Sequence, residues 1–598
     1  MEYLVLASLV GVPIAGLLLS QRATLVVLMT FVSTSAAGLV VNLLSTWGVD
    51  WHQQGLCGAL VASQLVSLAG FLRLRSSRFE HQERSWIPAF CLLALVVLVM
   101  LVRVMWARPV GELREAGVLI DLPHFYVGED NAKWMNILSQ ITQGTKVEIG
   151  GVGGVLVVFL AACWSVTKAI TGIFGGQVNQ QSVVFNSQFV ASVGLSLGSP
   201  FVLLPHLETK RLAGIRQVLI PMTVVVPLLS ASLFRVSFLG HLSEQLIITA
   251  LSLSVSVLAA SDTTEREVRL AWLLVAFSST IWLGLHFFSA AVLILALGSA
   301  WVHKRKLWTH RYSSMLGILA LLLPLRVVWD TYRYTNFTPE YLTSLFNAPG
   351  AVDAATSWQG LIAILAVVFG LGILKGDVEV RPTAQRILLP LSLVGYFVLV
   401  AMNDQWRTGK LNYGSTKLWF IMTIVFTTAF LVPAIQALAD GPGRRETRNR
   451  LLVMSMALLV ILTIDGAFTP LLTNLRSDVW SGYASAKDHS FRDFVRTNTS
   501  MPQDLDSGPI GCVVRKADGT LGINTETYSC TRFLVSLAGI ETECNRIIEW
   551  QLGVTPGDLK STLLTVQPDI RSRIFIELNE QNLVSGQLTL DEVIQELP

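Results

Sequence analysis

The chain has 598 residues, of which 52% are hydrophobic and 14% are charged, and its formal net charge is +3. Soluble domains carry about 25% charged residues, so this composition excludes a wholly soluble protein and predicts an integral membrane protein. A net charge this small gives no support for nucleic-acid binding.

Apolar segments near the ~20 residues needed to cross a bilayer recur from residue 3 to about residue 472. The first lacks a basic n-region and an A-x-A site, which predicts a retained span rather than a cleaved signal. By the positive-inside rule, the arginine-rich segment 73–85 is cytoplasmic, so the fourth span delivers 108–148 to the outer side. The first four spans are predicted at 3–19, 24–46, 55–72 and 86–107.

Short basic loops also predict the orientation of the later spans. The loops at 303–311, 375–386 and 439–450 are expected in the cytoplasm, which places 330–356 and 403–415 outside. Between the two halves, we expect 270–302 to form one long or broken span around Leu285 and His286, giving about 14 spans in all. Lys210, Arg211 and Arg216 then face outward.

After residue 472 the charged and polar density becomes ordinary, which predicts a small extracytoplasmic α+β domain over 473–598. FRDFVRTNTS is typical of a helix, GPIGCVVRKADGTLGI of strand, turn and strand, and RIFIEL of another strand. LTLDEVIQEL predicts a closing helix capped by Thr589. In an oxidising compartment we expect one disulfide among three cysteines, with the pairing left open. These are Cys512, Cys530 and Cys544.

An acidic pair, Glu129 and Asp130, lies in the outward loop 108–148. Apolar residues follow it at i, i+3, i+4 and i+7, which predicts a short helix along the membrane surface. Acids at a helix start favour two interpretations: a helix cap, or a general base beside the bilayer. The apolar stripe consists of Trp134, Ile137, Leu138 and Ile141.

A second polar group lies where the outward loop at 403–415 enters the next span. Arg407, Lys410 and Lys417, together with Tyr413, would suit a lipid phosphate at the interface. Snorkelling cations and aromatic belts at ordinary span ends are the alternative. Lys417 lies just inside an apolar helix, and an intramembrane charge is by default a candidate functional residue.

These features together resemble the GT-C class of membrane glycosyltransferases. Within that class the chain resembles the actinobacterial cell-envelope enzymes that use polyprenyl-phosphate sugars, such as arabinofuranosyltransferases. Residues 128–131 stand where that class has its first-loop acidic motif, and 413–417 are similar to a Tyr-x-x-x-Lys element of related enzymes. Here the acidic loop follows the fourth span rather than the first. The second acidic motif of many members has four candidates, namely Asp330, Glu340, Asp353 and Asp404.

The resemblance implies a plasma-membrane enzyme that moves a sugar from a polyprenyl-phosphate donor to a cell-envelope polysaccharide, with inversion at the anomeric carbon. Asp130 would act as the base, and Glu129 would support it or bind a divalent metal such as Mg²⁺, Mn²⁺ or Ca²⁺. Lys417, Lys410, Arg407 and Tyr413 would hold the donor phosphate, and Trp134 and Lys133 would contact the acceptor or the interface.

Two other functions stay open from the sequence. The first is transport or flipping of a lipid-linked saccharide, although transporters tend to carry an internal repeat and none is apparent here. The second is a non-catalytic role in cell-wall assembly, in which the C-terminal domain binds polymer or a partner enzyme.

Overall fold

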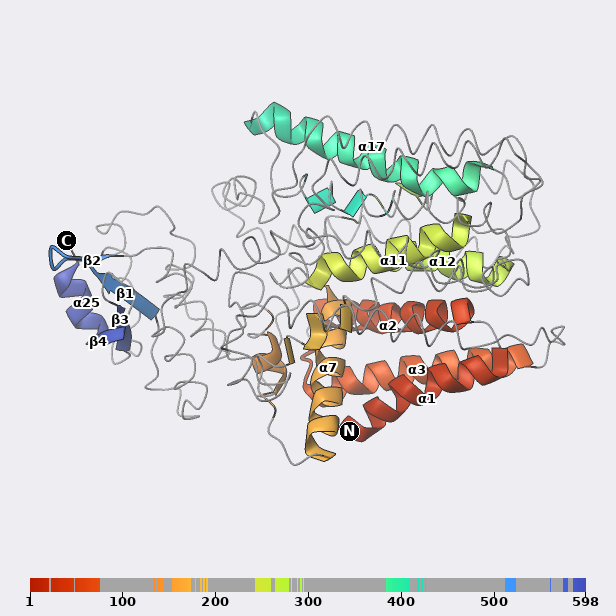
Figure 1. The fold of residues 1–598 in the computed structure, drawn as a ribbon, viewed down its shortest axis with the longest axis horizontal. Coiled ribbons are helices and arrows are strands. Elements are labelled where there is room, and N and C mark those ends of the chain that lie inside the picture. Colours follow the sequence, from red (N-terminus) through yellow and green to blue (C-terminus); the bar gives the residue numbers. More distant parts are fainter. Residues whose placement is uncertain are drawn as a thin grey trace, which may run out of the picture.

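The described part of the chain forms a group of helices and a small sheet with one helix packed on it (Figure 1). These elements come from a computed structural model. It describes residues 1–20, 23–47, 49–75, 134, 137–142, 153–173, 178, 183–184, 186–188, 190–191, 242–259, 264–278, 281, 285, 288, 291–292, 294, 383–408, 415, 417–418, 421–422, 425, 511–522, 560, 574–578 and 584–597.

Three long apolar helices open the chain: α1 (Glu2–Ser20), α2 (Ala23–Thr46) and α3 (Gln53–Arg75). All three confirm the predicted spans, and all are long and apolar enough to cross a membrane. Helices α2 and α3 run antiparallel, since Ser67 near the end of α3 donates to the carbonyl of Met29 near the start of α2. Helices α1 and α3 run parallel, because Phe71 of α3 fills the space beside Gly16 of α1.

Helices α11 (Leu242–Ala259) and α12 (Glu265–Ser278) form an antiparallel pair beside α2. The Ser254 hydroxyl of α11 donates to the Ala271 carbonyl of α12 at 3.2 Å. The start of α12 is fixed by a capping box, in which Thr264 and Glu267 satisfy each other's backbone amides. Every described side chain of α11 from Leu242 to Leu258 is buried, so this helix is central to the core.

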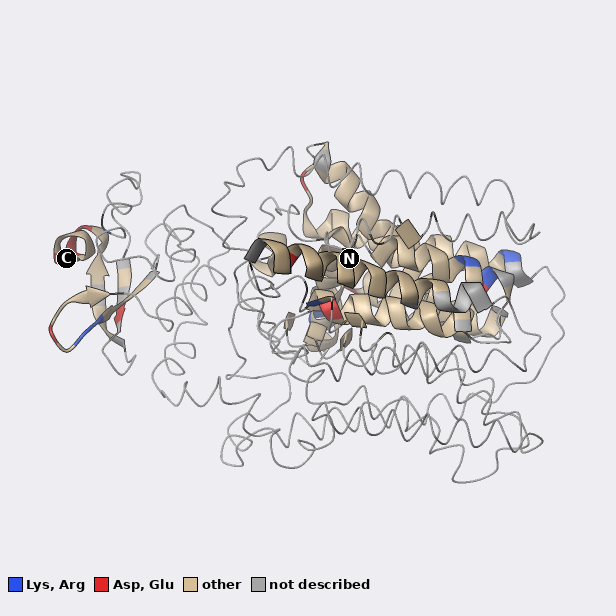
Figure 2. Ribbon diagram, turned by 90° about the horizontal axis from the view of Figure 1, so that it is seen from above, with Lys and Arg blue, Asp and Glu red and all other residues tan. Residues whose placement is uncertain are grey.

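One end of the helix group gathers basic residues, and we name it the arginine end after Arg73, Arg266 and Arg269. Leu270 of α12 packs against a buried cluster formed by the end of α3 and neighbouring turns of α1 and α2, which brings these arginines to the same end. Figure 2 shows blue Lys and Arg segments at one extreme of the helices. Helix α12 ends at Ser278, so the first part of the span predicted over 270–302 is helical, and most of the remaining residues of that span lie outside the described part of the chain.

The opposite end gathers carboxylates, and we name it the acidic end after Glu2, Glu244 and Asp404. Glu2 opens α1, and Glu244 lies in the first turn of α11. Asp404 lies in the last turns of α17 (Thr383–Thr408), whose C-terminal end lies on the same side as the start of α11 (Figure 1). Two of these carboxylates are paired with lysines at the same end, Glu2 with Lys168 and Glu244 with Lys417.

Helix α7 (Gly154–Ile173) is also long and apolar enough to cross a membrane, yet its contacts all lie at the acidic end. Its first residue, Gly154, donates its amide to Asn42 near the end of α2 at 3.0 Å. Its middle meets the start of α3, and its last turns meet the start of α1. Helix α7 thus runs across the ends of three helices rather than alongside them (Figure 1).

The α2–α7 crossing depends on glycine, because a Cβ atom at Gly38 would lie 2.5 Å from the backbone of Val155. We expect Gly38→Ala to push the two helices apart and to destabilise the protein by about 1–3 kcal/mol. The midpoint of thermal unfolding in detergent measures this. Gly58→Ala is the matched control, since a Cβ there meets nothing within 4 Å. Equal midpoints for the two variants would contradict the close approach.

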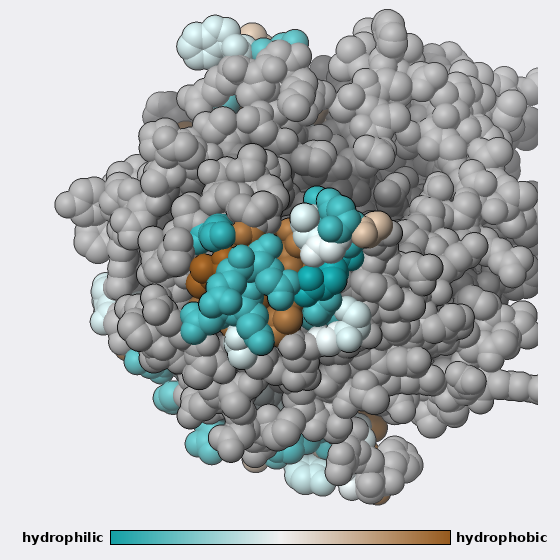
Figure 3. All heavy atoms as spheres, turned by 90° about the vertical axis from the view of Figure 1, so that its left-hand side faces the viewer, coloured by the Kyte–Doolittle hydropathy of each residue, from teal (hydrophilic) through white to brown (hydrophobic). Residues whose placement is uncertain are grey.

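The C-terminal residues form a four-stranded sheet with strand order β2-β1-β3-β4. Strands β1 (Gly511–Arg515) and β3 (Ile574–Leu578) are parallel, while β2 (Leu521–Gly522) and β4 (Val584–Thr589) pair antiparallel with their neighbours. The predicted strand-turn-strand and the RIFIEL strand are confirmed. Figure 3 shows hydrophilic side chains over much of this surface, with apolar ones between them.

An arginine joins three elements of this α+β unit. Arg515 of β1 pairs with Glu577 of β3 at 2.5 Å and with Glu596 of α25 (Leu590–Glu596) at 2.7 Å. These two carboxylates, Glu577 first, raise the pKa of the Arg515 guanidinium, which is already charged at any physiological pH. Arg515 therefore fixes α25 against the sheet.

The predicted cap of the last helix is also confirmed. The Thr589 hydroxyl accepts from the Glu592 amide, and Glu592 accepts in return from the Thr589 amide at 2.6 Å. The bond from the Thr589 amide, and then the bond from its hydroxyl, lowers the pKa of Glu592. A carboxyl whose pKa is depressed by folding adds stability at neutral pH, and this stability is lost as the pH falls through the folded pKa.

We expect Thr589→Ala to raise amide exchange in α25 roughly fivefold, because a lost N-cap frees the helix start. Hydrogen exchange of the C-terminal peptide in the intact protein measures this. The exposed Gln595→Ala in the same helix is the control. Wild-type protection, taken relative to the intrinsic exchange rate at each pH, should also fall below the ordinary pKa range of a glutamate, and Glu592→Gln should remove that fall. A pH response that is unchanged in Glu592→Gln would contradict the role of the carboxylate.

Several predicted elements lie outside the described residues. These are the fourth span at 86–107, most of the loop 108–148, the span between the loops 303–311 and 330–356, the span that follows the loop 439–450, and the helix predicted for FRDFVRTNTS.

Candidate active site

A buried ion pair lies at the acidic end, between Lys417 and Glu244. Lys417 is 8% exposed and Glu244 is 1% exposed, so both charges are removed from water. The Ser243 hydroxyl donates to the second carboxylate oxygen of Glu244 at 2.6 Å. Removing two charges from water costs several kcal/mol per ion. The ion pair and the Ser243 hydrogen bond offset this cost.

The helix start explains why the carboxylate can lie there. Glu244 is in the first turn of α11, where backbone amides lack intrahelical partners and the helix dipole favours an anion. Ser243 precedes it and supplies a further donor. Lys417 approaches from a separate helical segment that follows α17, so two distant parts of the sequence build the pair.

A second carboxylate, Asp404 of α17, is held by the segment that carries Lys417. Asp404 is 2% exposed, and it accepts a short hydrogen bond from the Ser415 hydroxyl. It lies near the C-terminal end of α17, where the dipole disfavours an anion. The Ser415 bond offsets part of that cost. Asp404 is one of the four residues that the sequence offers as a second acidic motif, and it is the only one of them within the described residues.

The apolar stripe that follows the acidic pair is helical where it is described. Trp134, Ile137, Leu138 and Ile141 are each at most 5% exposed and belong to the main hydrophobic cluster. The predicted helical period is confirmed for the described residues. The apolar stripe is covered by other parts of the protein, however, and does not lie along the membrane surface. Trp134 therefore anchors the start of this helix in the core.

The remaining predicted site residues lie outside the described part of the chain. These are Glu129, Asp130, Lys133, Lys410 and Tyr413, while Arg407 is described only as backbone in the last turn of α17. The structure pairs Lys417 with Glu244, which was not predicted, and it joins Asp404 to Ser415, two positions before Lys417.

Among the described residues, no three His, Cys, Asp or Glu side chains lie close enough to hold a metal ion. In the C-terminal unit Cys512 of β1 is disulfide-bonded and buried. Cys530 and Cys544, the two other cysteines of that unit, lie outside the described residues.

Sequence reasoning missed Glu244. The signal available was an acid next to a serine at the first turn of a long apolar helix, a position where a helix cap is the ordinary explanation. Its partner, Lys417, was selected because it is an intramembrane cation. Only the fold shows that these two residues meet.

No protein family, curated protein or solved structure matches the chain. The candidate site is therefore interpreted from its own geometry and chemistry.

Proposed function

We propose that the protein is a membrane glycosyltransferase that moves a sugar from a polyprenyl-phosphate donor to a cell-envelope glycan. The observation that carries the proposal is Lys417, a buried cation at the acidic end that pairs with Glu244. Ser415, two positions before Lys417, donates to Asp404. A cation in this position would suit a phosphate at the bilayer boundary. Arabinofuranose is the sugar that the sequence resemblance favours.

Lys417 can bind a phosphate oxygen while its ion pair with Glu244 stays intact. An ammonium group has three hydrogen-bond donors, so one can remain on the carboxylate while another reaches a phosphate oxygen. Away from water, this attraction is stronger than at an exposed site. A preorganised cation stabilises the charge that develops on a leaving phosphate, and it needs no reorganisation at the moment of reaction.

The transfer step follows from these parts. A hydroxyl oxygen of the acceptor attacks the anomeric carbon, and the bond from that carbon to the phosphate oxygen breaks. The polyprenyl phosphate leaves with the electron pair, and Lys417 stabilises its charge. Asp130 receives the proton of the hydroxyl as the general base.

The acidic end is assigned to the outer face in this proposal. The arginine end carries Arg73, Arg266 and Arg269, and arginine-rich ends face the cytoplasm. Nucleotide sugars are not supplied on the outer face, so a lipid-linked donor is the consistent choice. The C-terminal α+β unit then also lies outside, where the disulfide of Cys512 would persist.

A transfer assay with the intact protein tests the proposal. Vesicles containing the protein and a synthetic polyprenyl-phosphate arabinofuranose receive a neutral arabinan oligosaccharide, and mass spectrometry follows the acceptor. We expect acceptor extended by one sugar only when the donor is present. If no polyprenyl-phosphate pentose or hexose yields an extended acceptor, the proposed function is wrong.

The buried ion pair also favours a second candidate, transport of a lipid-linked saccharide, because intramembrane ion pairs often mark transport pathways. The same vesicles distinguish the two functions. Movement of the donor between leaflets without acceptor extension would identify a transporter.

A further inference from the structure

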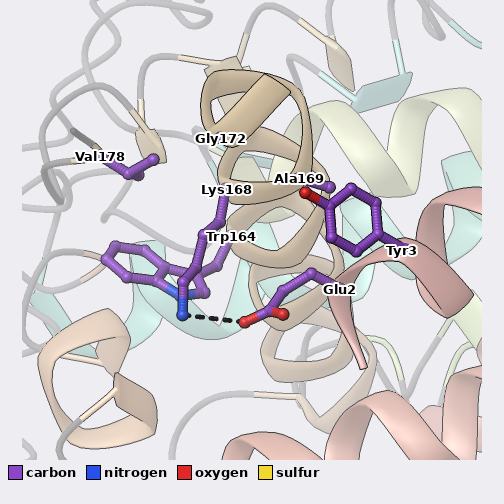
Figure 4. Close-up of a pocket in the computed structure, with 7 residues that line it drawn as sticks. All are labelled: Glu2, Tyr3, Trp164, Lys168, Ala169, Gly172 and Val178. Carbon is purple, nitrogen blue, oxygen red and sulfur yellow. Dashed lines mark ion pairs between the residues drawn. The ribbon is translucent and has the colours of Figure 1, made fainter. Parts of the chain in front are cut away.

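A cavity lies at the acidic end, where α7 passes over the start of α1 (Figure 4). Its volume is about 460 Å³, within the ~300–1,000 Å³ range of small-molecule sites. It does not include Lys417 or Glu244. It is lined by Glu2, Tyr3, Trp164, Lys168, Ala169, Gly172 and Val178.

An ion pair marks one side of the cavity. Lys168 of α7 contacts Glu2 of α1 at 2.9 Å, and the side chain of Lys168 is 52% exposed. Figure 4 shows the Lys168 chain running along the cavity toward the carboxylate. Both groups keep hydrogen-bonding capacity beyond this contact, since an ammonium has three donors and a carboxylate about four acceptor sites.

Two aromatic rings face the same space. Trp164 is partly buried on α7, and Tyr3 is 60% exposed on the first turn of α1. A Cβ atom at Gly172 would lie 3.7 Å from the Tyr3 hydroxyl, an ordinary contact distance, so the Tyr3 hydroxyl lies beside α7 at this residue. Tryptophan and tyrosine offer a flat apolar surface with a polar tip, which suits a ligand with both an apolar face and hydroxyl groups.

The Lys168–Glu2 pair, with the Met1 ammonium 4.0 Å from the same carboxylate, favours a neutral ligand over one that would compete for these charges. A phosphate near Lys168 would also meet the Glu2 carboxylate, and an ammonium near Glu2 would also meet Lys168, so either would disrupt the pair. A hydroxyl both donates and accepts. It can therefore accept from Lys168 and donate to Glu2 while the ion pair stays intact.

We propose that this cavity binds a neutral saccharide and holds the acceptor glycan. The identification as acceptor subsite rests on the proposed function, whereas the preference for a neutral polyhydroxyl ligand rests on the cavity itself. The cavity lies at the same end as Glu244 and Lys417, so a glycan chain seated here is on the face where the donor phosphate would bind.

Direct binding tests the proposal with the intact protein in nanodiscs and without any donor. The probe is a neutral arabinofuranose tetrasaccharide, followed by isothermal titration calorimetry. We expect Trp164→Ala and Lys168→Met each to raise its Kd at least tenfold, while Lys168→Arg, which can keep the ion pair, stays near wild type. Trp47→Ala is the control, because Trp47 is 81% exposed in the loop after α2 and does not line the cavity.

Size-exclusion chromatography confirms that each variant is folded before titration. No saturable binding to the wild type, or equal affinity in wild type and Trp164→Ala, would overturn the proposal. Trp164-dependent binding of a phosphocholine headgroup in place of the tetrasaccharide would overturn it too, and would make the cavity a lipid site. Trp164-dependent glycan binding by a protein that never transfers sugar would leave the neutral-saccharide site standing, but it would reject the proposed function and with it the acceptor role.

Discussion

Changing Glu244 to glutamine is expected to lower the stability of the intact protein by about 3–5 kcal/mol, because Lys417 would remain as a buried cation without its counter-charge. Lys417→Met alone should cost a comparable amount, since it leaves a buried carboxylate. The double variant should recover much of the loss. A double-mutant cycle of unfolding in detergent measures all three.

The Glu2–Lys168 pair supplies a matched control, because it lies at the same end but is about half exposed. Glu2→Gln should change stability by only about 0–1 kcal/mol, the usual range for an exposed pair. Equal costs for Glu244→Gln and Glu2→Gln would contradict the burial of the first pair.

The same double variant isolates the role of the cation in transfer. Glu244→Gln/Lys417→Met keeps the site uncharged and folded, so a rise in donor KM in this variant reports the lost phosphate contact. The acceptor KM should stay near wild type. A donor KM equal to that of the wild type would remove Lys417 from donor binding.

Changing Asp130 to asparagine is expected to reduce kcat for sugar transfer by about 10²–10⁴, the usual contribution of a general base. Asparagine keeps the shape and can still cap a helix, so stability should change little. This separates the two interpretations of the acidic pair, because a cap alone would leave kcat near the wild-type value. Transfer from the polyprenyl-phosphate donor measures kcat.

Two further observations sharpen this prediction. The acidic limb of the pH profile of kcat should reflect a carboxyl group in the wild type and should disappear in Asp130→Asn. Asp50→Asn is the control, because Asp50 is an exposed carboxylate in the loop between α2 and α3, at the acidic end. A loss of transfer shared by both variants would indicate a general effect of charge rather than a base.

The elements that the sequence predicted well are those whose signal is local. The first three spans and the strand-turn-strand at 511–522 follow from runs of apolar or alternating residues. The last helix follows from Thr589 and Glu592, three positions apart. The sequence does not predict strand β4, because its last two residues, 588–589, belong to the LTLDEVIQEL segment, whose pattern is that of a helix.

The elements that failed depend on partners that are distant in sequence. The period of Trp134 and Ile137 identifies an apolar face but does not say whether lipid or protein covers it. Composition alone makes α7 a span, whereas its glycine contacts with α2 place it across helix ends. Glu244 resembles a cap until Lys417 is brought to it.

The position of α7 also alters how the faces of the membrane are assigned along the chain. Helix α7 begins and ends at the acidic end, and α11 begins there as well. A chain that enters and leaves α7 at one end of the helix group gains no crossing parallel to α1, α2 and α3 from this helix, although its length and composition suit a span.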